Sequence, residues 1–160
     1  MDGVSSVENN ADGTGKNVIV LATTNCPWDV DEAMRRRLEK RIYIPLPDAK
    51  AREEMFAIYL KSLVLAKDVN IPDLVEKTQG FSGADIKLLC RDASMMPMRR
   101  AILSKNPEQI KEMKIRGDLG ADKIPLLMED FARALQKMQP SVSAATVAKY
   151  EAWNKEFASV

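Results

Sequence analysis

An asparagine and a run of arginines are the side chains in this sequence best suited to chemistry. Asn25 comes directly after an apolar, β-branched stretch, and Arg35, Arg36 and Arg37 follow in the next segment. Arginine presents a planar fork of N–H donors that matches phosphate oxygens, and an arginine inserted from a neighbouring molecule can stabilise the charge that develops in phosphoryl transfer. This order of residues indicates a device that senses phosphate.

Two apolar segments are expected to position these side chains. Residues 17–24 and 41–46 are rich in β-branched and aliphatic residues and are bounded by polar clusters, which is typical of strands covered on both faces in a parallel sheet. A short helix over residues 31–38 is predicted to join them. Ligands of parallel sheets bind at the carboxyl ends of the strands, so we expect Thr24 and Asn25 to face a site.

The residue types alone leave a simpler interpretation open. Asn25 would then only begin the turn over residues 25–28, and the arginines would only complement the negative end of a helix dipole. That interaction stabilises a helix by about 0.3 to 1 kcal/mol without any ligand. The order in which the segments follow one another favours the first interpretation.

Composition excludes several classes of protein. The chain has 160 residues, 46% of them hydrophobic and 29% charged, with a formal net charge of +1, so it can bury one ordinary core and has no positive excess for nucleic acid. No apolar run approaches the ~20 residues of a membrane-spanning helix, and the N-terminal residues lack the pattern of a signal peptide. We therefore expect an intracellular protein with no nucleic-acid partner and no membrane span.

Histidine is absent from the sequence, which excludes a histidine-based catalytic triad and the commonest metal ligand. Cys26 and Cys90 are the two cysteines, and they lack the spacing of metal ligands. We expect both to be buried free thiols, and no metal site is predicted.

The order of the segments resembles that of a known family. Residues 21–25, 31–38 and 41–48 are similar, in this order, to the second region of homology of the AAA ATPases, and residues 80–86 are similar to their sensor 2 segment. Among AAA proteins the chain resembles the meiotic clade, which comprises katanin, spastin, fidgetin and the vacuolar-sorting ATPase. The segments that most resemble the catalytic subunit of katanin are residues 35–41, 90–94, 98–100, 141–145 and 149–157.

The resemblance implies roles for the phosphate-sensing residues. Asn25 matches sensor 1, which in the family helps to orient the attacking water against the γ-phosphate. Arg36 and Arg37 match the arginine fingers that reach the ATP of the adjacent subunit. Arg35 matches an interface charge, and the triple run leaves open which two of the three arginines are the fingers.

A second set of implied nucleotide contacts lies further along the chain. Gly83 and Ala84 match positions that line the ribose and adenine pocket, where small residues allow the start of a helix to approach the nucleotide. The alternative is an ordinary helix start, which Ser82 and Asp85 would cap. The clade lacks the sensor 2 arginine of other AAA proteins, and this chain lacks it too.

The phosphate cradle of an ATPase is missing from the sequence. Residues 10–17 come nearest to a P-loop, but Asn10 replaces its first glycine and Asn17 replaces its hydroxyl residue. The family places the P-loop, the Mg²⁺-binding acidic pair and the pore loops before the segments found here. The resemblance thus implies a C-terminal fragment that uses ATP with Mg²⁺ only within its parent protein, binds no cofactor tightly by itself and cannot hydrolyse ATP alone.

The predicted architecture is an α/β fragment followed by helices, mostly α overall. Residues 1–64 are expected to be the C-terminal part of the nucleotide-binding domain, residues 65–140 a helical lid and residues 141–160 a C-terminal helix. The helices are predicted over residues 51–60, 71–78, 84–103, 107–114 and 129–138, with a last helix after Ser143. Pro97 is expected to kink the third of these.

The last helix carries aromatic residues at helical spacing. Tyr150, Trp153 and Phe157 would either close the core of the lid or form a patch that docks on the ATPase core. The resemblance favours the docking patch, because the last helix of the clade packs against the large domain and supports assembly of the hexamer.

The resemblance as a whole implies a microtubule-severing ATPase. Such an enzyme forms an ATP-dependent hexamer, acts on tubulin in microtubules of the cytoplasm, spindle or centrosome, and can bind a regulatory subunit. Two alternatives remain at this point. One is the vacuolar-sorting ATPase, whose lid normally contains an inserted β-domain, and the other is a non-catalytic helical interaction module.

Overall fold

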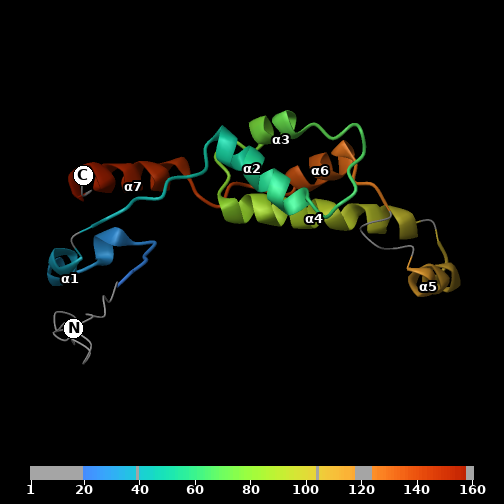
Figure 1. The fold of residues 1–160 in the computed structure, drawn as a ribbon, viewed down its shortest axis with the longest axis horizontal. Coiled ribbons are helices and arrows are strands. Elements are labelled where there is room, and N and C mark those ends of the chain that lie inside the picture. Colours follow the sequence, from blue (N-terminus) through green and yellow to red (C-terminus); the bar gives the residue numbers. More distant parts are fainter. Residues whose placement is uncertain (1–19, 39, 104, 118–123, 158–160) are drawn as a thin grey trace, which may run out of the picture. The chain divides into compact units, whose positions relative to one another are not determined.

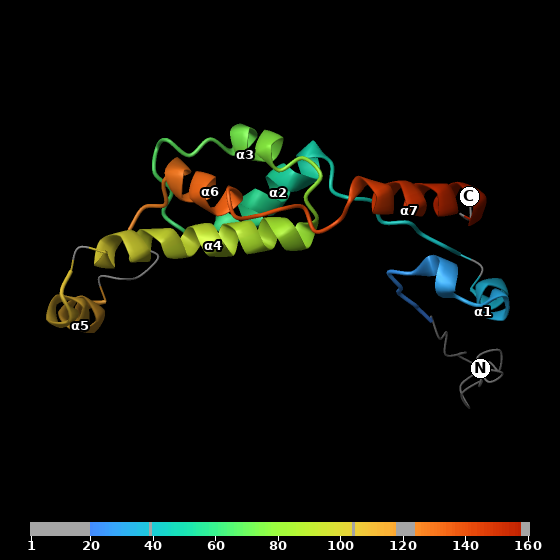
Figure 2. The same cartoon turned by 180° about the vertical axis from the view of Figure 1, so that it is seen from behind.

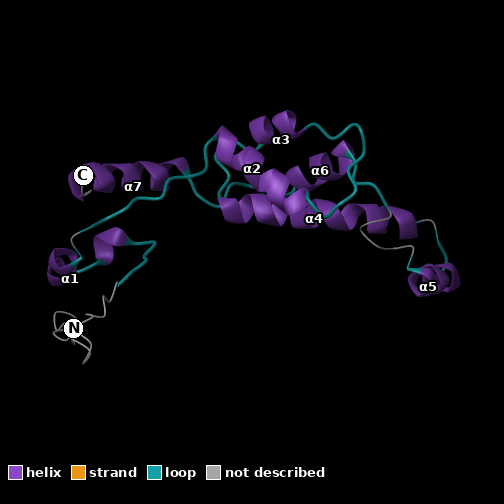
Figure 3. Ribbon diagram, in the orientation of Figure 1, coloured by secondary structure: helices purple, strands orange, loops and turns teal. Residues whose placement is uncertain are grey.

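The computed structural model describes residues 20–38, 40–103, 105–117 and 124–157. The chain divides into two units, one formed by Met1–Arg41 with Ser159–Val160 and the other by Ile42–Ala158. Figure 1 shows the elements in sequence colours and Figure 3 shows them by type.

The first unit contains two short helical segments. A 3₁₀ turn, η1, spans Pro27–Asp29 and a helix, α1, spans Glu32–Arg37. The carboxylate of Asp31 accepts a hydrogen bond of 2.8 Å from the backbone N–H of Met34, which satisfies one of the free donors at the start of α1. This confirms the short helix predicted between the two apolar segments.

The two predicted strands are not formed in the described residues. Residues 20–24 and 41–46 have no regular secondary structure, and residues 17–19 lie outside the described part. A strand needs a neighbour to accept and donate its backbone hydrogen bonds. Leu21, Ile42 and Ile44 are 84 to 85% exposed, because the described residues provide no layer that covers them.

The second unit is helical. Its helices are α2 Ala49–Leu60, α3 Ile71–Lys77, α4 Gly83–Ile102, α5 Pro107–Arg116, α6 Met128–Leu135 and α7 Ala144–Phe157. The helices predicted from the sequence are therefore confirmed, with ends that shift by a few residues. Helix α4 continues through Pro97 as one element. No described helix is long and apolar enough to cross a membrane.

Local capping explains where several of these helices begin and end. Asp48 accepts a 2.7 Å hydrogen bond from the N–H of Ala51 at the start of α2, and Asn106 and Gln109 form a reciprocal capping box at the start of α5. Gly117 ends α5 with a φ of 70°, in the left-handed region that glycine adopts without strain.

The core of this unit lies between α2, α4 and α6, with α3 packed on α2. Figures 1 and 2 show α2 and α6 each packed along α4, seen from opposite directions. The fully buried side chains at its centre are Phe56, Leu74, Ile86, Leu89, Ala93, Phe131 and Ala134. The amphipathic faces of α2, α4 and α6 meet there, and no residue of α7 belongs to this core.

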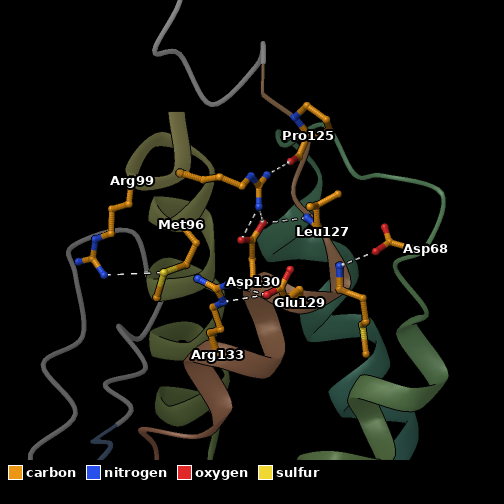
Figure 4. Close-up of polar contacts among 10 residues, drawn as sticks. Asp68, Met96, Arg99, Pro125, Leu127, Glu129, Asp130 and Arg133 are labelled. Atoms are coloured by element: carbon orange, nitrogen blue, oxygen red, sulfur yellow. Dashed lines mark hydrogen bonds and ion pairs between the residues drawn. The ribbon is translucent and has the colours of Figure 1, made fainter. Parts of the chain in front are cut away.

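A polar cluster holds the start of α6 to the end of α4 (Figure 4). The carboxylate of Asp130 accepts hydrogen bonds of 2.7 and 2.9 Å from the guanidinium of Arg100 and of 2.9 Å from the N–H of Leu127. The same guanidinium donates to the carbonyl of Pro125 at 3.0 Å. We call these four residues the Asp130 cluster.

A short β-bridge lies next to the Asp130 cluster. Leu65 pairs with Leu126 in parallel, with the N–H of Ala66 bonded to the carbonyl of Leu126 at 2.9 Å and the N–H of Leu126 bonded to the carbonyl of Val64 at 2.8 Å. The bridge and the cluster together fix the connection between α2 and α3 against the start of α6.

Candidate functional site

Helix α1 positions the three consecutive arginines, and the structure uses Arg35 differently from the other two. The guanidinium of Arg35 is half-buried and donates a 2.6 Å hydrogen bond to the carbonyl of Val30, ahead of the helix. The carbonyl of Arg35 in turn accepts a 3.2 Å bond from the guanidinium of Arg41. Arg35 therefore ties α1 to the chain on both sides of it.

Arg36 and Arg37 instead extend from the last turn of α1. Both are exposed, and the side chain of Arg36 is 79% exposed while it pairs with Glu32 one turn earlier at 2.5 Å. An exposed ion pair of this kind stabilises a protein by only about 0 to 1 kcal/mol. A phosphate can therefore displace Glu32 from Arg36 at little cost.

Asn25 lies exposed at a bend immediately before η1. The hydroxyl oxygen of Thr24 accepts a 3.0 Å hydrogen bond from the N–H of Cys26, which tightens the turn on which Asn25 is carried. Asn25 and the arginines of α1 thus belong to one unit of the chain, whereas Gly83 and Ala84 belong to the other.

Gly83 and Ala84 form the first turn of α4. A Cβ atom at Gly83 would lie 3.4 Å from Cε of Met55, an ordinary van der Waals contact with the end of a flexible side chain of α2. Ala84 is exposed. Packing therefore does not require a glycine at position 83, and Ala84 leaves the first turn of α4 accessible.

Asp85 joins the start of α4 to the segment before α7, a contact that the sequence did not predict. One oxygen of its carboxylate accepts hydrogen bonds from the N–H and the hydroxyl of Ser82, both at 2.8 Å, and from the hydroxyl and the N–H of Ser141 at 2.9 and 3.2 Å. Burial by itself raises the pKa of Asp85, but the hydrogen bonds from Ser82 and Ser141 outweigh it and hold the pKa below its ordinary value. The capping box was visible in the sequence, but the contact with Ser141 was not.

The aromatic residues of α7 have partners outside the helical core. The ring of Tyr150 stacks on the ring of Tyr43 with centroids 6.2 Å apart, and Trp153 lies 5.2 Å from Phe157. Tyr43 lies on the segment predicted to be the second strand of the nucleotide-binding domain. Because α7 has no buried residue, its aromatic side chains do not close the lid core, and their docking on the ATPase core stays a prediction.

The described residues contain no cluster of His, Cys, Asp and Glu that could hold a metal ion. Both cysteines are free, as predicted, and Cys90 is buried, but the prediction that both are buried is wrong for Cys26, which is exposed on the turn before η1. Burial raises the pKa of the Cys90 thiol to about 12, so this thiol stays protonated and unreactive at neutral pH.

Three family models match successive parts of the chain. Residues 1–46 match the ATPase family associated with various cellular activities (AAA), residues 68–112 match the AAA+ lid domain and residues 104–157 match the Vps4 C terminal oligomerisation domain. The sequence is 52% identical over 160 residues to the A-like 1 form of the katanin p60 ATPase-containing subunit from Danio rerio, covering 100% of this chain and 32% of that protein. It is 51% identical over 159 residues to the A1 form from Arabidopsis thaliana, covering 99% of this chain and 30% of that protein.

The chain belongs to the katanin group of AAA ATPases. It spans about a third of the length of the curated relatives it matches. A crystal structure of the FIGL-1 AAA domain in complex with ADP aligns with a TM-score of 0.71 and 33% identity, covering 86% of this chain and 44% of that one. A structure described as the basis for katanin self-assembly aligns with a TM-score of 0.69 and 36% identity, covering 82% and 45%.

These matches place the described helices within the AAA architecture. Helices α3, α4 and most of α5 lie within the residues that match the AAA+ lid, and α6 and α7 lie within those that match the oligomerisation domain. Helix α1 with its arginines lies within the match to the AAA domain itself.

Proposed function

We propose that this chain is the part of a microtubule-severing AAA ATPase that completes the ATP site of a neighbouring subunit. In this proposal Asn25 orients the attacking water in the subunit's own site, and Arg36 and Arg37 reach the γ-phosphate held by the next subunit of a hexameric ring. Gly83 and Ala84 lie beside the ribose and adenine. The rest of the parent protein supplies the P-loop, the acidic pair that binds Mg²⁺ and the pore loops that bind tubulin.

One observation carries this proposal. Of the three consecutive arginines, Arg35 is half-buried and donates to the carbonyl of Val30, whereas the side chains of Arg36 and Arg37 are exposed on the last turn of α1. Two adjacent guanidinium groups on the last turn of a helix suit an approach to phosphate oxygens from outside. The contact of Arg35 supports the assignment of Arg36 and Arg37, and not Arg35, as the fingers.

The test replaces Arg36 or Arg37 by Ala in the full-length parent protein and measures ATP turnover and ATP affinity. We expect turnover to fall about a thousandfold or more while ATP affinity changes little, because an arginine finger acts on the transition state. Arg116→Ala is the matched control, since Arg116 is an equally exposed arginine paired with a glutamate one turn earlier. Turnover retained in both finger variants would refute the proposal.

Mixed rings test whether the arginines act on the neighbouring subunit. Subunits with an inactive P-loop still offer their fingers, and subunits that carry Arg36→Ala and Arg37→Ala still bind ATP. Mixing the two should restore turnover at those interfaces where intact fingers face an intact ATP site. Failure of every mixture would exclude a role for these arginines in trans.

The vacuolar-sorting ATPase is the second candidate, because residues 104–157 match the Vps4 C terminal oligomerisation domain. Against it, the described residues between α4 and α6 contain the helix α5 and no strand that would begin an inserted β-domain. We propose that the parent protein is cytoplasmic and associated with microtubules. ATP turnover stimulated by microtubules supports severing, turnover indifferent to microtubules supports the second candidate, and no turnover in the parent supports a non-catalytic module.

A further inference from the structure

A buried arginine joins three segments of the helical unit. Arg52 lies in the first turn of α2, and only 7% of it is exposed. Its Nη1 donates a 2.9 Å hydrogen bond to the carbonyl of Pro47, ahead of α2. Its Nε and Nη2 donate bonds of 3.2 and 3.0 Å to the carbonyl of Val75, in the last turn of α3. We call these three bonds the Arg52 latch.

Carbonyl oxygens satisfy this buried guanidinium. In the part of the chain that the structure describes, no carboxylate pairs with Arg52. A buried cation is costly unless its donors are satisfied. The carbonyls in the last turn of a helix lack partners within that helix and form the negative end of its dipole, so the carbonyl of Val75 suits a cation. The planar fork of arginine lets the same group reach Pro47 as well.

The Arg52 latch crosses the boundary between two family matches. Residues 1–46 match the AAA domain and residues 68–112 match the AAA+ lid domain. Pro47 is the first residue after the AAA match, Val75 lies within the lid match, and Arg52 lies between the two. Helix α2 also packs on α3 and α4, so it belongs to the same helical body. The latch therefore adds Pro47 to that body.

We propose that Arg52 is a positioning residue that makes Pro47 move with the lid. The chain that enters the lid then bends ahead of Pro47, and the segment from Pro47 to α3 moves as one body. The inference rests on the proposed function, in which the lid residues Gly83 and Ala84 lie beside the ribose and adenine. Without the latch, a second bend opens between Pro47 and α2.

A second bend would weaken nucleotide binding. The lid would hold Gly83 and Ala84 at the nucleotide for only a fraction of the time, and the apparent Kd rises in inverse proportion to that fraction. A fall of this fraction to about a fifth raises the Kd for ADP about fivefold. Because the effect concerns binding and not the transition state, kcat at saturating ATP should change less than Kd.

Two pairs of spin labels in the full-length parent protein separate the placement of the lid from its internal packing. The first pair joins Cys26, which is exposed and lies in the AAA match, to Lys87→Cys on α4. The second pair joins Lys61→Cys, just after α2, to Lys87→Cys, with Cys26 replaced by serine. Pulsed electron paramagnetic resonance gives the width of each distance distribution in unassembled subunits without nucleotide, after the other reactive cysteines of the parent are replaced.

Arg52→Met removes the donors and keeps the length of the side chain. We expect it to broaden the distribution of the first pair about twofold, to leave that of the second pair unchanged and to raise the Kd for ADP about fivefold. Arg52→Lys keeps a positive charge near the end of α3, but an ammonium lacks the planar fork that reaches both carbonyls. It should therefore act like Arg52→Met.

Arg100→Met is the matched control. Arg100 also donates to a backbone carbonyl, that of Pro125 at 3.0 Å, and its loss destabilises the same helical unit through Asp130. These partners lie at the start of α6 and not ahead of α2. The width for the first pair and the Kd for ADP should thus match the wild type, at a temperature where circular dichroism shows that every variant is folded.

Four results would overturn the latch. They are an unchanged first-pair distribution in Arg52→Met, equal broadening in Arg100→Met, broadening of the second pair in Arg52→Met, and wild-type behaviour of Arg52→Lys. The last result would show that charge near α3 is enough without a bond to Pro47.

The proposed function is tested separately, because the widths of the distance distributions do not depend on the arginine fingers. Loss of turnover in Arg36→Ala and Arg37→Ala would still support the proposed function if the latch failed. Retained turnover in those two variants, together with broadening in Arg52→Met, would refute the proposed function and keep Arg52 as the residue that positions Pro47.

Discussion

Replacement of Asp130 by alanine should destabilise the helical unit more than any exposed ion pair does. The Asp130 side chain is 5% exposed, and its carboxylate holds the N–H of Leu127 and the guanidinium of Arg100 (Figure 4). Leucine at the cap position offers no side-chain acceptor, so Asp130 accepts the N–H of Leu127 from within the helix, and Asp68 accepts the N–H of Met128 from outside it. The variant removes both interactions at once.

The magnitude follows from the two contacts. Loss of a capping bond costs about 1 kcal/mol. The pair with Arg100 adds about 1 kcal/mol, because Asp130 is buried but the Arg100 side chain is 40% exposed and regains water when the partner is lost. The sum of about 2 kcal/mol corresponds to a fall in Tm of about 4 to 8 °C for a chain of this length.

Urea unfolding followed by circular dichroism measures this free energy, and Glu129→Ala is the matched control. Glu129 pairs with Arg133 one turn later at 2.6 Å, but the two side chains are 63% and 64% exposed, so its loss should cost less than about 0.5 kcal/mol. Asp130→Asn keeps one acceptor for Leu127 and should fall between the two. Equal losses for Asp130→Ala and Glu129→Ala would refute the reasoning.

Three further predictions follow from residues near the candidate site. In the native chain a thiol reagent should modify the exposed Cys26 rapidly, while Cys90, whose pKa is raised to about 12 by burial, should react only on the timescale of unfolding; equal rates measured by mass spectrometry would contradict this. The folded-state pKa of Asp85 is lowered, so its negative charge stabilises the fold above the unfolded-state pKa, and this stability is lost as the pH falls. The difference in unfolding free energy between wild type and Asp85→Asn should therefore be constant from about pH 5 to 7 and shrink below about pH 4. Gly83→Ala should stabilise the helical unit by about 0.5 kcal/mol, because the new Cβ would make an ordinary contact with the flexible end of Met55 and alanine favours the helix. A loss of more than about 1 kcal/mol in the free energy of urea unfolding would show that there is no room for the Cβ atom.

The sequence predicted the helices well because their signals are local. Asp48, Ser82 and Asn106 each cap a helix through a backbone group only a few residues away, and Gly117 ends one in the conformation that glycine favours. The apolar faces of α2 and α4 form the core that their spacing indicated, whereas α5 has no buried residue. The family resemblance came from the order of short motifs, and the comparisons confirm it.

The contacts between distant segments could not be predicted from the sequence. Nothing near Asp85 indicates Ser141 as its partner, and the pattern of α6 does not show that Asp130 pairs with Arg100. The two predicted strands failed for a related reason, since residues 20–24 and 41–46 have strand composition but the described residues provide no neighbouring strand. The roles of Asn25, Arg36, Arg37, Gly83 and Ala84 stay predictions, because they depend on a nucleotide and on a second subunit.

The bridge between Leu65 and Leu126 has a consequence for how the lid is made during translation. Met128 donates a hydrogen bond to Asp68, 60 residues earlier in the chain, and Phe131 and Ala134 fill the centre of the core. A ribosome that has released α2, α3 and α4 has therefore not yet released the residues that cover them. The apolar faces of these helices stay exposed to solvent until α6 emerges. A nascent chain paused before α6 should therefore bind chaperones strongly and be cleaved rapidly by proteases.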